Sequence, residues 1–136
     1  MVSPANTIHG RALFVILNPK YFDRKLVFVC SPYSGDTETH ISNTRRYCRF
    51  VFDRGAVPFA PHLYFPQFMD EADAEQRNVS MGAGLVVLAE ADELWVFGDK
   101  LTDEMRLELE VADGFGIPMK FFGDDCKGGR CLDDLR

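Results

Sequence analysis

The fold is decided by one stretch near the amino terminus, Leu26-Val27-Phe28-Val29-Cys30-Ser31-Pro32-Tyr33-Ser34-Gly35-Asp36. Its first five residues are apolar and rich in Val and Phe, which is typical of a strand buried on both faces in a parallel sheet. Pro32 ends the strand because it has no N–H for a sheet ladder. Gly35 is free to adopt a positive φ, and Asp36 or Thr37 can cap the helix that follows.

This order of strand, tight loop and helix start predicts an anion site. The first turn of a helix offers unpaired N–H groups and the positive end of the helix dipole. Ser31, Tyr33 and Ser34 add hydroxyl donors. We therefore expect a phosphate, sulfate or carboxylate to bind at residues 31–36, unless the carboxylate of Asp36 already occupies those donors. A plain turn without a ligand is the alternative.

Length and composition set limits on the class of protein. The chain has 136 residues, of which 46% are hydrophobic, which suits one globular domain. Its net charge of −6 argues against general nucleic-acid binding, which depends on neutralising phosphates. No apolar run approaches the roughly 20 residues of a membrane span, and the first residues lack the layout of a signal peptide. We expect a cytoplasmic protein with neither nucleic-acid nor membrane partners.

The segments that follow alternate between strands and helices. This alternation predicts an α/β fold with a doubly wound, mostly parallel sheet and helices on both faces. The expected strands are residues 26–30, 56–59, 93–97 and 118–121, and the expected helices are residues 36–54, 70–89 and 102–116, with a loose turn at residues 82–84. The first helix is expected to bury a stripe of Ile41, Thr44, Cys48, Val51 and Phe52.

Two flanking segments lie outside the domain that we expect at residues 26–122. Residues 1–25 form an N-terminal extension, in which residues 12–17 are predicted to be a strand at a sheet edge or between subunits. Residues 123–136 form a polar tail, which we expect to be mobile. Cys126 and Cys131 in this tail have no His nearby, so we expect free thiols and no metal site.

Glu108 is the main candidate functional residue. On a helix capped by Thr102, it lies near the middle of an apolar arc at about 100° per residue, and Glu104 lies one turn before it on the same side. A carboxylate in an apolar face is costly unless it is paired, so a functional role is favoured. The alternative is a structural ion pair with Arg77 or Arg45. The arc also contains Met105, Leu107, Leu109, Val111, Ala112 and Phe115.

Residues 61–66 follow the second expected strand and are the other candidates for a site. Ligands of open α/β sheets bind outside the carboxyl ends of the strands. His62 and Tyr64 are therefore candidate pocket residues. A structural role for His62 is the alternative, because single His side chains are often structural.

Five segments together resemble the nucleoside 2-deoxyribosyltransferase-like superfamily, in particular its small DUF4406-like domains. They are residues 27–35 (VFVCSPYSG), 60–64 (APHLY), 92–98 (DELWVFG), 105–112 (MRLELEVA) and 116–118 (GIP). The similarity spans about residues 26–121, and the superfamily includes the 2′-deoxynucleoside 5′-phosphate N-hydrolases. It implies a flavodoxin-like (Rossmann-like) sheet, a nucleoside or nucleotide as the small-molecule partner, and a homodimer or higher homo-oligomer.

The resemblance also implies roles for individual residues. The nucleophile of these enzymes is a Glu on the helix after the third core strand, where Glu108 lies, and the loop after the first strand holds the sugar or its phosphate. Gly84 stands where they commonly carry an Asp that helps handle the base. We expect no metal and no cofactor. The candidate catalytic residue is Glu108, and the candidate substrate-binding residues are Ser31, Tyr33, Ser34, Gly35, His62, Tyr64 and Glu104.

Three classes of function remain open at this point. The first is an N-glycosidase or deoxyribosyltransferase that uses Glu108 as nucleophile. The second is a nucleotide-binding module that has kept the pocket and lost the chemistry. The third is a structural or partner-binding protein in which the buried Glu belongs to an ion pair.

Overall fold

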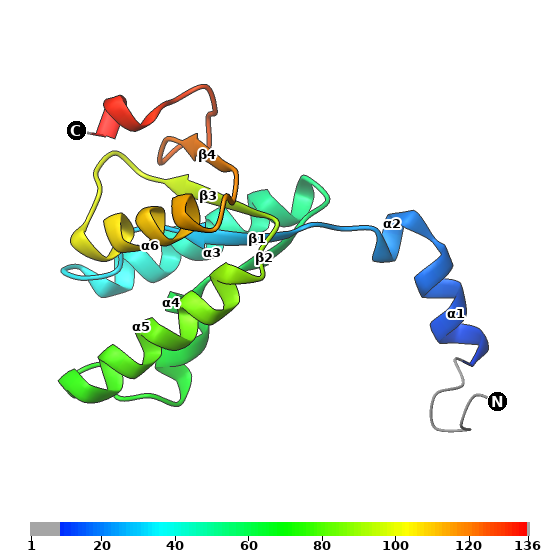
Figure 1. The fold of residues 1–136 in the computed structure, drawn as a ribbon, viewed down its shortest axis with the longest axis horizontal. Helices are drawn as coiled ribbons and strands as arrows, with labels where there is room; N and C mark the ends of the chain where they lie inside the picture. The colour runs from blue at the N-terminus through cyan, green and yellow to red at the C-terminus, as the bar shows by residue number, and fades with distance from the viewer. Residues whose placement is uncertain (1–8, 136) are drawn as a thin grey trace.

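A four-stranded parallel sheet forms the centre of the molecule (Figure 1). The computed structural model describes residues 9–135, so the first eight residues of the N-terminal extension lie outside the described range. The strands β1 (Leu26–Cys30), β2 (Val57–Phe59), β3 (Glu93–Phe97) and β4 (Met119–Phe122) lie in the order β2-β1-β3-β4. All three pairings are parallel, which confirms the predicted α/β fold with a flavodoxin-like sheet.

Helices cover both faces of this sheet, because side chains of a strand point alternately to opposite faces. Val27 and Val29 pack on one face with Tyr47 and Val51 of α3 (Thr37–Asp53). On the other face, Phe28, Cys30, Leu94 and Val96 pack with residues of α5 (Ala74–Ala89) and α6 (Asp103–Gly114). The buried strands are therefore apolar on both sides, as the continuous run at residues 26–30 predicts.

The helix starts are capped by side-chain oxygens. Asp36 accepts a hydrogen bond from the Thr39 N–H, and Thr102 accepts one from the Met105 N–H, so both predicted caps are confirmed. Helix α5 begins after Asp73, which caps it, and not at residue 70 as predicted. It also runs without a break through residues 82–84, where we expected a loose turn.

The connection from β2 through α5 to β3 passes over β1 and creates a switch point. After β2, the short helices α4 (Pro61–Tyr64) and η2 (Phe65–Gln67) lead to α5, and the chain then returns to form β3 on the other side of β1. The connections leaving β1 and β3 therefore diverge at their carboxyl ends. In open α/β sheets this is the place where ligands bind.

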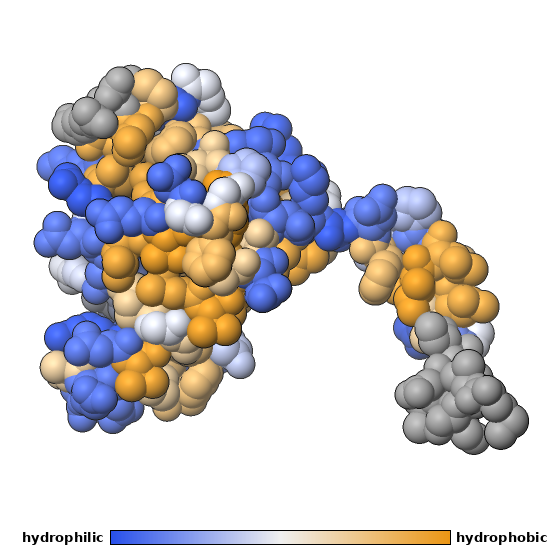
Figure 2. All heavy atoms as spheres, viewed as in Figure 1, coloured by the Kyte–Doolittle hydropathy of each residue, from blue (hydrophilic) through white to orange (hydrophobic). Residues whose placement is uncertain are grey.

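The predicted strand at residues 12–17 is wrong, because this segment is helical. Helix α1 (Gly10–Leu17) and helix α2 (Pro19–Phe22) form an arm that projects from the body (Figure 1). A short apolar run does not distinguish strand from helix by itself, and a helix satisfies its own backbone where no sheet edge is at hand. Phe14, Leu17 and Phe22 of this arm are 60–71% exposed and give it an apolar surface (Figure 2). No helix of the described residues is long and apolar enough to cross a membrane.

The predicted buried faces of α3 and α6 include residues that are exposed in the structure. Phe52 was assigned to the buried stripe of α3 but is 48% exposed, whereas Tyr47 is buried. Leu107 and Phe115 were assigned to the inward arc of α6 but are 39% and 64% exposed. Helix α6 packs on the sheet and on α5, so only the central part of its arc is covered.

The prediction of a mobile tail is wrong as well. Asp124 accepts hydrogen bonds from Tyr47 Oη at 2.6 Å and from Arg46 Nη2 at 2.9 Å. Phe121 and Arg130 form an antiparallel bridge, and the short helix η3 (Leu132–Leu135) places Leu135 in the core. The tail therefore folds back against the edge of the sheet.

Candidate active site

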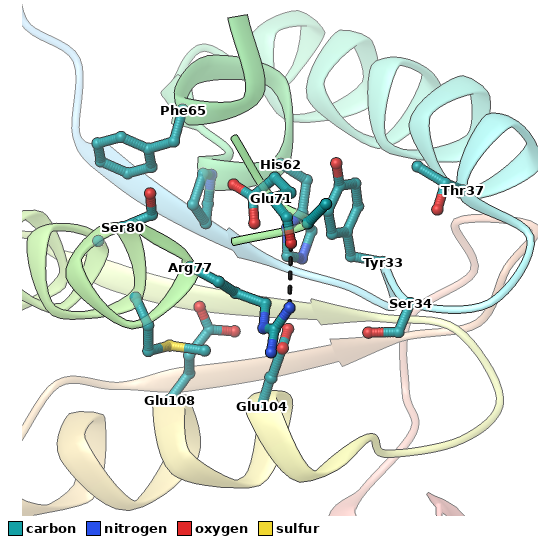
Figure 3. Close-up of a pocket in the computed structure, with 14 residues that line it drawn as sticks. Tyr33, Ser34, Thr37, His62, Phe65, Glu71, Arg77, Ser80, Glu104 and Glu108 are labelled. Carbon is teal, nitrogen blue, oxygen red and sulfur yellow. Dashed lines mark hydrogen bonds between the residues drawn. The ribbon is translucent and has the colours of Figure 1, made fainter. Parts of the chain in front are cut away.

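A cavity of about 450 Å³ lies at the carboxyl ends of β1 and β2 and beside α5 and α6 (Figure 3). This volume falls within the range of small-molecule sites. Its wall comes from the loop after β1 and the start of α3, from the α4–η2 segment, from residues 71–72 before α5, from the first half of α5, and from the first two turns of α6. The lining residues are Tyr33, Ser34, Thr37, Pro61, His62, Phe65, Glu71, Ala72, Arg77, Ser80, Met81, Gly84, Glu104 and Glu108.

Five of the eight candidate residues line this cavity, namely Tyr33, Ser34, His62, Glu104 and Glu108. The other three lie elsewhere. Ser31 is buried, and its Oγ lies 3.1 Å from Thr44 Oγ1 on α3. Gly35 supplies the turn before α3, with φ at 93°. Tyr64 is 52% exposed and packs edge-on against Phe65 and Phe68.

The start of α3, where we expected an anion, is occupied by a side chain of the protein. Asp36 accepts hydrogen bonds from the N–H of Thr39 at 3.2 Å and from its hydroxyl at 2.7 Å. These bonds with Thr39 lower the pKa of Asp36. The N–H of Thr37 donates to the Gly35 carbonyl at 2.9 Å. The carboxylate of Asp36 thus takes the place of the expected anion, which is the condition that argues against binding a phosphate here.

His62 forms part of the floor of the cavity and is held by two contacts. One ring nitrogen, Nε2, lies 2.9 Å from the Ser31 carbonyl oxygen, so this nitrogen donates. The ring also stacks on Tyr33, with centroids 4.5 Å apart and an angle of 8° between the planes. Burial lowers the pKa of His62 to about 4, so the imidazole is neutral at pH 7 and acts as a fixed platform for Tyr33.

Glu108 is buried and directed into the cavity. Its side chain projects from α6 toward α5 (Figure 3), and the residue is 3% exposed. Burial raises the pKa of Glu108 to about 8; a hydrogen bond with the Cys30 thiol opposes this rise, and the charge of Glu104 adds to it. Burial, followed by the charge of Glu108, raises the pKa of the Cys30 thiol in turn. At pH 7 the Glu108 carboxyl is therefore mostly protonated.

A structural ion pair of Glu108 has no support in this geometry. The ion pairs found among the described residues do not include it. Arg45 lies on α3, across the sheet from α6. Arg77 lines the same cavity, but its guanidinium donates to the Glu71 carbonyl at 3.0 Å (Figure 3).

The charges around the cavity are mainly negative. Glu71 and Glu104 contribute carboxylates, Glu108 contributes a mostly protonated carboxyl group, and Arg77 alone of the described lining residues carries a full positive charge. Burial and the charge of Glu104 raise the pKa of Glu71. Burial and the charges of Glu71 and Glu104 raise the pKa of Tyr33. An additional anion would therefore be bound against the negative charges of Glu71 and Glu104.

Several lining residues were missed by reasoning from the sequence, among them Ser80, Phe65 and Glu71. Ser80 and Gly84 lie one turn apart on the inward face of α5, and both are buried. The small residues around Gly84 give α5 little contrast between its faces, so the pattern did not indicate which side chains face the sheet. Glu71 precedes the helix, in a segment whose position no periodicity predicts.

The fold and the cavity define a flavodoxin-like α/β protein with a cavity of small-molecule size beside the switch point of its sheet. Residues 25–122 match the family described as Domain of unknown function (DUF7768), and the chain belongs to this family. The more specific DUF4406-like assignment is therefore replaced by this one. A search of curated proteins by sequence found no match.

The fold itself is similar to that of a 2-deoxyribosyltransferase from the psychrotolerant bacterium Bacillus psychrosaccharolyticus. The two chains are 21% identical, with a TM-score of 0.57, and the alignment covers 81% of this chain and 82% of that one. This similarity confirms the predicted nucleoside 2-deoxyribosyltransferase-like fold.

Proposed function

We propose that this protein binds a 2′-deoxynucleoside and cleaves its N-glycosidic bond, or transfers its deoxyribosyl group, with Glu108 as nucleophile. One observation carries this proposal: Glu108 is a buried carboxyl group that faces a cavity of small-molecule size and has no basic partner among the described residues. Such groups are costly to keep and concentrate at functional sites. The similar fold of a 2-deoxyribosyltransferase adds support.

The proposed reaction has two steps. In the first, an oxygen of the ionised Glu108 carboxylate bonds to C1′ of the sugar, and the bond from C1′ to the base nitrogen breaks. The base leaves with the electron pair and takes a proton from a neighbouring acid or from solvent. In the second step, water or another base attacks C1′ and releases the carboxylate. The positive charge that develops on the sugar would be stabilised by Glu104 and Glu108.

The charges of the site favour a nucleoside over its 5′-phosphate. At the start of α3, Asp36 already accepts from the N–H and the hydroxyl of Thr39, and Glu38 adds a second carboxylate in the first turn. Arg77 is the one full positive charge among the described lining residues, and it is shared with the backbone of Glu71. A dianionic phosphate would therefore meet little compensation.

Incubation with a panel of 2′-deoxynucleosides and their 5′-monophosphates, followed by chromatography of the released base, tests the proposal. We expect release from the nucleosides, its loss in Glu108→Gln, and its retention in the matched control Glu110→Gln, whose side chain is exposed on the same helix. A thermal shift with nucleosides but no release would indicate a binding module. The absence of both base release and a thermal shift would favour a structural or partner-binding protein.

We also propose that the N-terminal arm, residues 9–25, joins two copies of the chain. The apolar side chains Phe14, Leu17 and Phe22 of the arm are exposed. The arm carries four basic and one acidic side chain, a net charge of +3, so the remaining residues carry −9 of the total of −6. Opposite charge and exposed apolar surface both favour docking of the arm on the body of a second copy.

Light scattering after size exclusion tests this arm. We expect the full chain to be a homo-oligomer, and a chain lacking residues 1–24 or carrying Leu17→Glu to be smaller. Binding of the full-length monomer to anionic vesicles would instead indicate a membrane partner. An oligomer unchanged by both variants would place the interface elsewhere.

A further inference from the structure

Ser80 is a buried polar residue whose hydroxyl has no hydrogen-bond partner among the described residues. It lies in the middle of α5 and is 6% exposed. A hydroxyl on a helix commonly donates to the carbonyl four residues earlier, and Ser80 does not make that bond. Unpaired buried hydroxyl groups are rare and costly in folded proteins, so this one calls for a physical reason.

The position of Ser80 indicates that reason, because the residue lines the cavity. Figure 3 shows Ser80 and Phe65 at one end of the cavity, and Ser34 and Thr37 at the other. The walls near Ser80 come from α5 and from the α4–η2 segment. The hydroxyl is thus an unpaired polar group on the wall of the cavity.

The wall of the cavity beside Ser80 is apolar. Gly84 follows Ser80 by one turn of α5, and a Cβ at Gly84 would lie 3.6 Å from Pro61 Cβ and 3.8 Å from the Phe65 ring. The space between Gly84 and Pro61 therefore holds no more than a methyl group, so a ring can lie against these residues but not between them. Met81 adds a further apolar surface. Together, Pro61, Phe65, Met81 and Gly84 form what we call the apolar slot.

We infer that the apolar slot binds a planar heteroaromatic base and that Ser80 Oγ hydrogen-bonds to the edge of this base. The inference rests on the proposed function, since the base would be that of the nucleoside. A flat ring suits apolar walls, and its edge groups supply the partner that Ser80 lacks. A hydrocarbon would leave the hydroxyl unpaired, and a sugar or phosphate would need more polar contacts than the slot offers.

The chemistry of the hydroxyl also determines how selective this contact is. A Ser hydroxyl donates one hydrogen bond and accepts others. It can therefore pair with a ring nitrogen or carbonyl of one base and with the amino group of another. Ser80 should strengthen binding of several bases by similar factors, so that selectivity among them is low.

Ser80→Ala separates a ligand contact from a structural role. In the unliganded protein, this change removes an unpaired hydroxyl, so the melting temperature should stay the same or rise. In the complex it removes one hydrogen bond, which should weaken binding about 3- to 10-fold. The matched control is Ser42→Ala, whose side chain is exposed on α3.

The experiment is calorimetric titration with free adenine, hypoxanthine and cytosine, and with benzimidazole, which lacks the six-membered ring's nitrogens and exocyclic groups. We expect the three bases to bind more weakly to Ser80→Ala, whereas benzimidazole binds equally to both proteins and Ser42→Ala behaves as the native chain. Equal affinity of the bases for both proteins, a melting temperature lowered by Ser80→Ala, or no binding of any base at millimolar concentration would each overturn the inference. Base binding without cleavage of any nucleoside would reject the proposed reaction but would still support the inference that the apolar slot binds a base.

Discussion

Replacing Glu108 by Gln should stabilise the protein at neutral pH. In the folded protein the pKa of Glu108 is raised from 4.5 to about 8, so its carboxyl keeps a proton that the unfolded chain releases above pH 4.5. The native chain therefore loses stability as the pH rises from 4.5 toward 8. At pH 7, which is about 2.5 pH units above the pKa of 4.5 in the unfolded chain, ionisation of Glu108 stabilises the unfolded state. At 1.36 kcal/mol per unit, this lowers the free energy of unfolding by roughly 3 kcal/mol. Gln is neutral in both states and avoids this cost.

Urea unfolding of the native chain and of Glu108→Gln between pH 4 and pH 8 measures this difference. The two proteins should have the same free energy of unfolding near pH 4, where both side chains are neutral. The Gln variant should then gain with rising pH, by roughly 3 kcal/mol at pH 7, while Glu110→Gln follows the native chain. The Oε1 of Gln can still accept from the Cys30 thiol. A constant difference across this pH range, or a Gln variant that is less stable at pH 7, would refute the reasoning.

Three further predictions concern Glu108, Asp36 and Glu93. If Glu108 is the nucleophile, kcat/KM for base release should rise with pH, reach half of its maximum near pH 8 and level off about one pH unit higher, because the ionised form reacts; a fall through this range would indicate a general acid instead. Millimolar phosphate should leave the NMR signals of the Ser34 and Gly35 amides unshifted, since Asp36 already fills the start of α3, and clear shifts there would restore the anion site. Burial would raise the pKa of Glu93, but bonds from Lys120, Lys25 and Trp95 lower it below 4.5, so Glu93→Gln should cost about 1 kcal/mol at pH 7 by denaturation, and this cost should shrink as the pH falls below 4.5 and the Glu93 carboxyl takes up a proton.

The central sheet and its helix starts were predictable because strong local signals agree with the fold. The continuous apolar run at residues 26–30 fits only a strand that is buried on both faces. Asp36 and Thr102 cap the helices where the sequence indicates. The burial of Glu108 was also predictable, since this residue lies at the centre of the apolar arc of α6. A wrong assignment at the edges of the arc does not change which residues lie at its centre. Leu107 and Phe115 lie at those edges, and their burial depends on how far the neighbouring helix reaches.

What the sequence did not reveal depends on contacts between distant segments. Residues 12–17 are equally apolar in a strand and in a helix, and the choice depends on whether a sheet edge is available. The fixing of the tail depends on Asp124 meeting Tyr47 and Arg46, which are 77 and 78 residues away. The role of Ser80 as a wall of the cavity depends on the path of α4 and η2, which no pattern in α5 encodes.

The central position of β1 in the sheet has a consequence for the synthesis of the protein on the ribosome. Its neighbour β3 is made much later, as the hydrogen bond between Leu26 and Asp92 spans 66 residues. At a synthesis rate of about 5–20 residues per second, this interval lasts roughly 3–13 s. During that time the nascent chain exposes one edge of an uncharged, Val-rich strand, the kind of segment that templates aggregation. We therefore expect the yield of soluble protein to depend on chaperones that hold the chain until β3 has left the ribosome.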